Sequence, residues 1–144
     1  RPIPVTPMSM PAIFFTASED DAARVELNHN LPSDDVVELG GVDTLKLSML
    51  WAIIDGKEWD VDSLDAFKEL KATDSEWTHR LPEELTQKIE RLKGLELERV
   101  AREWSATEEM GCSPAEGKEL LMEISVAARR AIQTQRGLFL YTCL

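Results

Sequence analysis

The chain has 144 residues, of which 43% are hydrophobic and 30% charged, and its formal net charge is −11. A chain of this length suits one domain that buries roughly 70% of its unfolded surface, so its core needs no disulfide or metal. The composition argues against disorder of the whole chain, and the absence of a basic stripe argues against nucleic-acid binding. Neither an apolar run of about 18 residues nor a secretion signal is recognisable, so we expect a cytoplasmic protein and no membrane span.

The first eleven residues stand apart from the rest of the chain. Four prolines within residues 1–11 forbid a helix and favour extended chain. We expect residues 1–11 to be a Pro-rich arm, or an addition from cloning, without a function of its own. A single α+β domain is then expected over residues 12–144.

The domain opens with a strand and a helix. Residues 12–17 form a short apolar run with two phenylalanines, which predicts a buried strand. Ser18 and the three acids behind it predict a helix start, because first-turn amides and the helix dipole favour oxygen atoms and negative charge. This helix is expected to end near Asn28.

Residues 44–55 predict the most apolar helix of the chain. Its interior is apolar almost all round, which is typical of a helix in the centre of a fold. Asp43 is suited to cap its start, and Gly56 to end it in the left-handed conformation. Residues 77–81 alternate and predict a strand. Between them, a shorter helix starting at Asp62 or Ser63 is expected to carry Leu64, Phe67 and Leu70.

Three further helices are expected in the second half of the chain. Pro82 suits the first position of one helix, and another follows directly with Trp104 on its apolar face. Ser113 and Glu116 form a capping box at the start of the third. Its apolar stripe contains three alanines, which imply close approach to another element, and Gly137 is expected to close it.

The last seven residues, 138–144, are apolar on both faces and predict a buried strand. The simplest closure pairs this strand with the first one. We therefore expect a single compact α+β domain, with a small sheet that includes both terminal strands and is covered by five or six helices.

The negative charge is concentrated in residues 18–43, where eight acids and one base, Arg24, give a net charge of −7. Such a field attracts basic partners, so we expect an acidic face that binds a basic protein. Plain solubility is the alternative explanation. The candidate binding residues on this face are Asp20, Asp21, Asp34 and Asp35.

A second candidate site lies behind Trp104, where Glu108 occupies the next position on the apolar stripe, flanked by Thr107 and Glu109. A carboxylate on an inward face beside a tryptophan is desolvated, which raises its pKa and suits it to acid/base chemistry or ligand binding. The alternative is that the helix ends here and that Glu108 and Glu109 lie at the rim of the core, in contact with solvent.

Other chemistry finds little support in the residue pattern. Cys112, Cys143, His29 and His79 are scattered, so they predict neither a zinc site nor a catalytic triad. The cysteines are expected to be small buried hydrophobes, with a single bridge between them left open. No nucleotide-binding motif is present, so we assign no catalytic residue, metal or cofactor.

Four segments together resemble a family of small acidic bacterial proteins of unknown function. The resemblance covers residues 12–144 and implies an α+β fold in the bacterial cytoplasm, but no activity and no catalytic residues. The segments are Gly41-Val42-Asp43, Leu50-Trp51-Ala52-Ile53-Ile54, Glu103-Trp104-Ser105-Ala106-Thr107-Glu108-Glu109 and Gly137-Leu138-Phe139-Leu140.

The sequence therefore favours a non-enzymatic protein-binding or regulatory module that uses an acidic face. The alternative is a small-molecule-binding domain, or an acid/base enzyme, with a pocket near Trp104 and Glu108.

Overall fold

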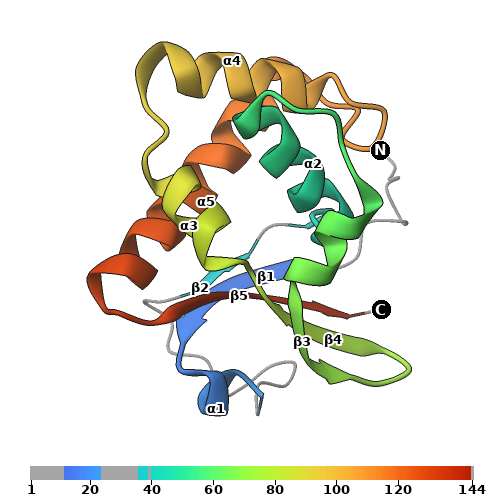
Figure 1. The fold of residues 1–144 in the computed structure, drawn as a ribbon, viewed down its shortest axis with the longest axis vertical. Helices are drawn as coiled ribbons and strands as arrows, with labels where there is room; N and C mark the ends of the chain where they lie inside the picture. The colour runs from blue at the N-terminus through green and yellow to red at the C-terminus, as the bar shows by residue number, and fades with distance from the viewer. Residues whose placement is uncertain (1–11, 24–35, 39, 144) are drawn as a thin grey trace, which may run out of the picture.

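Among the residues that the computed structural model describes, five antiparallel strands form one sheet with the strand order β2-β1-β5-β4-β3 (Figure 1). The structure describes residues 12–23, 36–38 and 40–143. Its strands are β1 Ala12–Ala17, β2 Val36–Glu38, β3 Lys68–Ala72, β4 Glu76–Arg80 and β5 Gly137–Cys143. Its helices are α1 Glu19–Ala22, α2 Thr44–Asp55, the 3₁₀ helix η2 Val61–Ala66, α3 Glu83–Glu90, α4 Gly94–Ser105 and α5 Pro114–Gln133.

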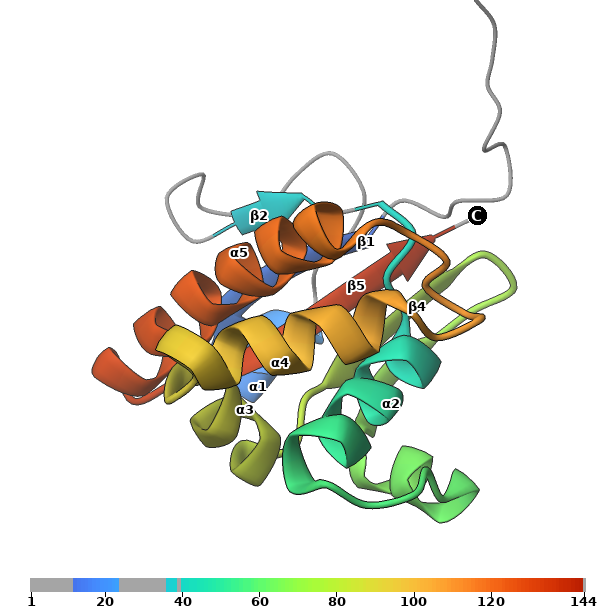
Figure 2. The same cartoon turned by 90° about the horizontal axis from the view of Figure 1, so that it is seen from above.

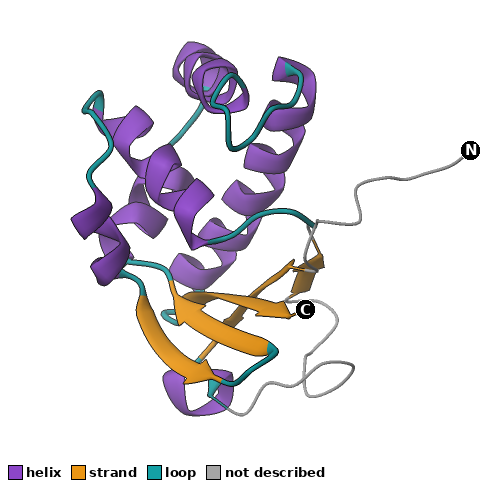
Figure 3. Ribbon diagram, turned by 90° about the vertical axis from the view of Figure 1, so that its right-hand side faces the viewer, coloured by secondary structure: helices purple, strands orange, loops and turns teal. Residues whose placement is uncertain are grey.

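The predicted pairing of the first and last strands is confirmed. β1 runs antiparallel to β5 along its whole length, from the pair Ala12–Thr142 to the pair Ala17–Gly137. Helices α2 to α5 lie on one face of the sheet and α1 lies on the other (Figures 1 and 3). The predicted α+β class, with one compact domain and helices packed on a small sheet, is confirmed.

β5 lies in the middle of the sheet because it is apolar on both faces. Leu138 and Leu140 face the helices, whereas Phe139 and Tyr141 belong to a second apolar cluster on the opposite face. All four side chains are at most 1% exposed. A strand buried on both sides requires a layer on each face, since side chains alternate along it.

The helix ends follow the capping signals in the sequence. Asp43 accepts a hydrogen bond at 2.9 Å from the backbone N–H of Lys46, and Gly56 ends α2 with φ of 67°. Ser113 and Glu116 form the expected capping box at the start of α5. These motifs are local, so the surrounding fold does not have to be known to find them.

Two expectations about the helices are wrong. Only Leu47, Ser48 and Leu50 of α2 are buried, so α2 lies at the side of the helical layer, next to α4 and η2 (Figure 2). α5 covers the centre of the sheet instead, because its small residues allow close approach. α5 ends at Gln133, and Gln135 adopts the left-handed conformation with φ of 57°, while Gly137 begins β5.

The segment after residue 60 also differs from expectation. The short helix ends at Ala66, and Leu70 lies on the unexpected strand β3, which pairs with β4. Phe67 is buried and packs edge-on against Trp51, with ring centroids 6.5 Å apart. Pairing with β4 overrides the helix preference of the lysine, glutamate and leucine in this stretch. The expected end of the first helix near Asn28 lies outside the described residues.

α4 and α5 cross closely at Gly117, which is buried within α5. A Cβ atom at this position would overlap the Ser105 hydroxyl of α4 and lie 3.3 Å from the Ala101 carbonyl oxygen. Ser105 is itself held, because its hydroxyl donates to the Ala101 carbonyl at 2.6 Å. The glycine therefore sets the distance between the two helices.

We predict that Gly117→Ala destabilises the fold by about 1–3 kcal/mol, because overpacking here outweighs the helix preference of alanine. Urea unfolding followed by circular dichroism measures this loss. Glu119→Ala, at an exposed position of the same helix, is the matched control and should leave stability nearly unchanged. A Gly117→Ala variant as stable as the parent would contradict the close crossing.

Candidate functional site

Trp104 anchors the helical layer and does not line an open site. Its side chain is fully buried, and its indole N–H donates to the Lys46 carbonyl of α2 at 2.9 Å. The Thr107 hydroxyl donates to the Trp104 carbonyl at 2.7 Å. Trp104 therefore holds the end of α4 against α2, whereas the Thr107 hydroxyl caps a carbonyl at the end of α4 itself.

The expectation of an inward carboxylate behind Trp104 is wrong. α4 ends at Ser105, so the helical spacing that would turn Glu108 toward the core stops three residues earlier. Glu108 and Glu109 are both exposed. They border a shallow hollow of about 300 Å³, together with Thr107 and Trp59.

The acidic segment 18–43 is partly used to hold the fold. On α1, Asp20 and Asp21 are exposed, as a binding face requires. Asp34 and Asp35 lie outside the described residues. Asp43 caps α2, so its carboxylate has a structural role.

Glu19 joins α1 to the hairpin of β3 and β4. One carboxylate oxygen accepts from Lys68 at 2.8 Å and the other from Arg80 at 2.6 Å. These hydrogen bonds, first that of Lys68 and then that of Arg80, hold the pKa of Glu19 below its ordinary value. Arg80 also lies over the ring of Phe139, 5.9 Å from its centroid.

A second acidic stretch lies between α2 and β3. We call residues 58–65 the η2 patch, because η2 forms most of it. Trp59 and Val61 are 38% and 58% exposed there. Its four acids are all exposed: Glu58, Asp60, Asp62 and Asp65.

A hollow of about 320 Å³ adjoins the η2 patch, and we call it the η2 hollow. Trp51 lines it, and the buried indole N–H of Trp51 has no hydrogen-bond partner among the described residues. The Ser48 hydroxyl, also on the lining, accepts from the Trp59 indole at 2.8 Å. The carboxylates that line the hollow are Asp55, Glu58, Asp60 and Glu84.

Only part of this negative charge is neutralised. Lys88 donates to Asp55 at 2.6 Å and to Glu84 at 3.0 Å, and these hydrogen bonds raise the pKa of Lys88. No ion pair among the described residues holds Glu58 or Asp60. Lys57, which also lines the hollow, offsets one further negative charge. Because four carboxylates line the hollow, its lining still keeps an excess of negative charge.

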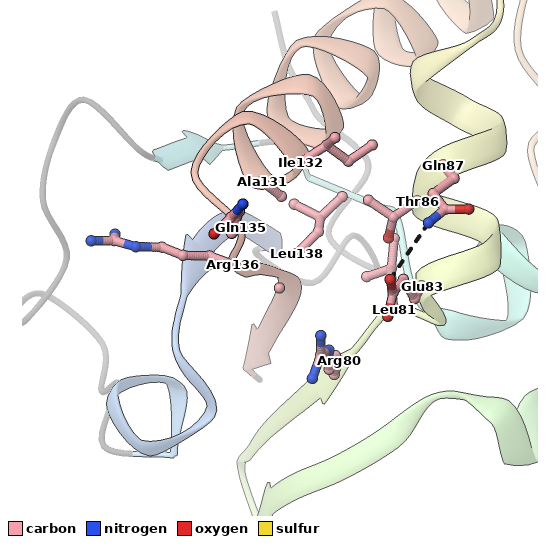
Figure 4. Close-up of a pocket in the computed structure, with 11 residues that line it drawn as sticks. Arg80, Leu81, Glu83, Thr86, Gln87, Ala131, Ile132, Gln135, Arg136 and Leu138 are labelled. Atoms are coloured by element: carbon pink, nitrogen blue, oxygen red, sulfur yellow. Dashed lines mark hydrogen bonds between the residues drawn. The ribbon is translucent and has the colours of Figure 1, made fainter.

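A third hollow, of about 290 Å³, lies at the C-terminal end of α5 and is called the α5 hollow (Figure 4). Its polar lining comes from three places in the fold: Arg80 at the end of β4, Glu83, Thr86 and Gln87 on α3, and Gln135 and Arg136 after α5. No feature of the sequence alone brings these residues together, since they are separated by up to 56 positions.

The structure describes no group of three or more His, Cys, Asp or Glu side chains that could hold a metal ion. Cys112 and Cys143 are free thiols, so the bridge left open by the sequence does not form. His79 lies on β4, where burial lowers its pKa. Among the described helices, none is long and apolar enough to cross a membrane.

Comparison with known proteins finds no matching family model, no matching curated protein and no matching solved structure.

We predict that Glu19→Gln lowers stability at neutral pH and has little effect in acid. Because the pKa of Glu19 is lowered in the folded state, its carboxylate stabilises the fold above the unfolded value of 4.5. That contribution is lost as the pH falls through the lowered folded pKa. Urea unfolding between pH 7 and strongly acid pH should show the two proteins converging.

Asp20→Asn is the matched control on the same helix, because Asp20 is exposed. It should change stability less than Glu19→Gln at pH 7. A Glu19→Gln variant whose stability equals that of the parent at pH 7 would contradict the role of Glu19 in holding α1.

Proposed function

We propose that this chain is a non-enzymatic protein-binding module that captures a basic partner through an acidic surface. The observation that carries the proposal is the η2 patch, where exposed Trp59 and Val61 stand among four exposed carboxylates. A net charge of −11 supports a basic partner, because it speeds the encounter with positive charge. The same charge repels phosphate backbones, so the proposed partner is a protein and not a nucleic acid.

Two kinds of contact support binding at the η2 patch. Tryptophan is enriched among the residues that dominate binding energy, and Trp59 is already oriented by its hydrogen bond to Ser48. A partly buried apolar anchor within a charged rim is the usual composition of a protein interface. The carboxylates around it would then select the partner by charge and set its orientation.

The η2 hollow supports a more specific role in this binding. A lysine or arginine side chain of the partner fits a hollow with Trp51 on its wall and carboxylates around it, because ammonium and guanidinium groups are attracted to both. Asp20 and Asp21 on α1 add exposed negative charge to the molecule. In the proposal they contribute to the encounter, together with Asp34 and Asp35.

An acid/base enzyme with Glu108 at its centre has less support. Glu108 is exposed, and Trp104 is buried with its N–H already bonded. The small hollow beside Glu108 and Glu109 lies next to Trp59, so in the proposal it forms the margin of the same binding surface.

A cytoplasmic location is part of the proposal, and the free thiols of Cys112 and Cys143 agree with a reducing compartment. Membership of a family of small acidic bacterial proteins remains a prediction from the resemblance.

We predict that reversing three charges of the η2 patch abolishes capture of the partner. Immobilised protein is exposed to lysate at low salt and at about 0.5 M salt, since screening weakens contacts of this kind. The parent should retain a basic protein at low salt and release most of it at high salt. The patch variant carries Glu58→Lys, Asp62→Lys and Asp65→Lys.

The control variant reverses three exposed acids elsewhere and so changes the net charge equally. It should retain the partner as the parent does. If no basic protein is retained, or if the patch variant retains it as well as the control, the proposed function is wrong. The control carries Asp74→Lys, Glu119→Lys and Glu123→Lys, at positions that are all exposed.

A further inference from the structure

The α5 hollow has an apolar floor and a polar rim. Leu81, Ala131 and Leu138 line it and are at most 1% exposed, whereas Ile132 at its edge is 39% exposed. Small-ligand sites commonly combine an apolar lining with a few fixed polar groups. The α5 hollow is separate from the η2 hollow, since the two linings share no residue.

Arg80 supplies a cation that the fold holds in place. One of its N–H groups is bonded to Glu19, and its guanidinium lies over the Phe139 ring. A Cβ atom at Gly137 would approach both the Arg80 Nε and the Phe139 ring to 2.9 Å, so glycine leaves room for these two side chains. Arginine has five N–H donors, and only the one on Glu19 is bonded among the described residues.

The start of α3 adds further donors at the rim. Pro82 is the N-cap of α3 and provides no side-chain cap, and the first intrahelical bond is donated by the Thr86 N–H. The backbone N–H groups of Glu83, Glu84 and Leu85 therefore lack a side-chain cap, and of these three residues Glu83 lines the hollow. Figure 4 shows Glu83, Leu81 and Arg80 on the same side of the hollow.

Gln135 stands opposite α3 in a strained conformation. Its φ of 57° is in the left-handed region, which favours glycine. Its side-chain amide forms no hydrogen bond with any described residue. The left-handed conformation closes α5, because the Arg136 N–H donates to the Ala131 carbonyl at 2.9 Å, and it leaves the Gln135 side chain at the edge of the hollow. Arg136 differs, because its side chain extends away from the other lining residues (Figure 4).

The charges around the hollow limit what it accepts. Glu83 is the carboxylate of the rim, and the Gln87 amide donates to it at 3.5 Å. Glu19 already occupies one side of Arg80. A ligand with one negative charge is therefore favoured over a ligand with two, because these carboxylates repel the second charge.

We propose that the α5 hollow binds a small organic carboxylate with an apolar tail. Its carboxylate accepts hydrogen bonds from the free donors of Arg80, with the Gln135 amide and the start of α3 beside it. Its tail replaces water over Ile132, the 39% exposed apolar side chain at the edge of the hollow. Removal of Glu83 strengthens binding, because that carboxylate repels the ligand.

The test uses hexanoate and its neutral amide, hexanamide, as probes in an NMR titration of the backbone amides. Hexanoate should give saturable shifts clustered on Glu83, Leu85 and Leu138, and hexanamide should bind at least tenfold more weakly. Arg80→Gln should weaken hexanoate binding at least tenfold, and Glu83→Gln should strengthen it several-fold. Arg102→Gln, at an exposed position of α4, is the matched control and should bind as the parent does.

Gln135→Gly keeps the test decisive if Arg80→Gln does not fold. It relieves the left-handed strain, so it should raise the unfolding midpoint while weakening hexanoate binding. Equal shifts from hexanoate and hexanamide, shifts scattered over the surface, or no shift at tens of millimolar hexanoate would each overturn the proposal. So would a Glu83→Gln variant that binds hexanoate more weakly than the parent.

Discussion

The burial of β5 on both faces is the constraint from which the rest of the structure follows. β5 lies between β1 and β4, and Phe139 stacks on Phe15 of β1 with ring centroids 5.5 Å apart. Because its side chains alternate between two apolar clusters, one face needs the helical layer and the other needs a second cover. The three small residues of α5 near its end, Ala127, Ala128 and Ala131, allow that helix to approach the sheet, and all are at most 4% exposed.

The same arrangement places both candidate binding sites around the start of α3. Glu83 lines the α5 hollow, and its neighbour Glu84 lines the η2 hollow. Glu84 is held by Lys88, which also joins α3 to α2 through Asp55. Consecutive residues of one helical turn therefore line two hollows, for which we propose opposite ligands, a cation in one and an anion in the other.

Much of the fold could be predicted from the sequence because its signals are local. The cap at Asp43, the left-handed Gly56 and the capping box at Ser113 each involve residues within a few positions of one another, and all three were found. The pairing of the terminal strands was predicted from their apolar character alone. β3 was missed, because its strand state depends on pairing with β4 and not on its own residues.

The sites were predicted less well, for a physical reason. The sequence spacing turns Glu108 toward the core only if the helix continues past Ser105, and the earlier helix end exposes it. The bond between Glu19 and Arg80 joins residues 61 positions apart, and no local pattern indicates it. This bond also reduces the number of acids in residues 18–43 that are able to bind a partner, because the Glu19 carboxylate is used to hold α1. The net charge can be counted from the sequence. Which acids hold the fold and which remain exposed for binding cannot be predicted from it.

Native-state hydrogen exchange tests the central role of β5 most directly. β5 has a hydrogen-bonded neighbour on each side, so its backbone amides should exchange only through global unfolding, together with those of β1. Amides of the edge strand β3 should exchange faster, through local opening. If the amides of Phe139, Leu140 and Tyr141 exchange as fast as those of β3, β5 is not the strand on which this fold is built.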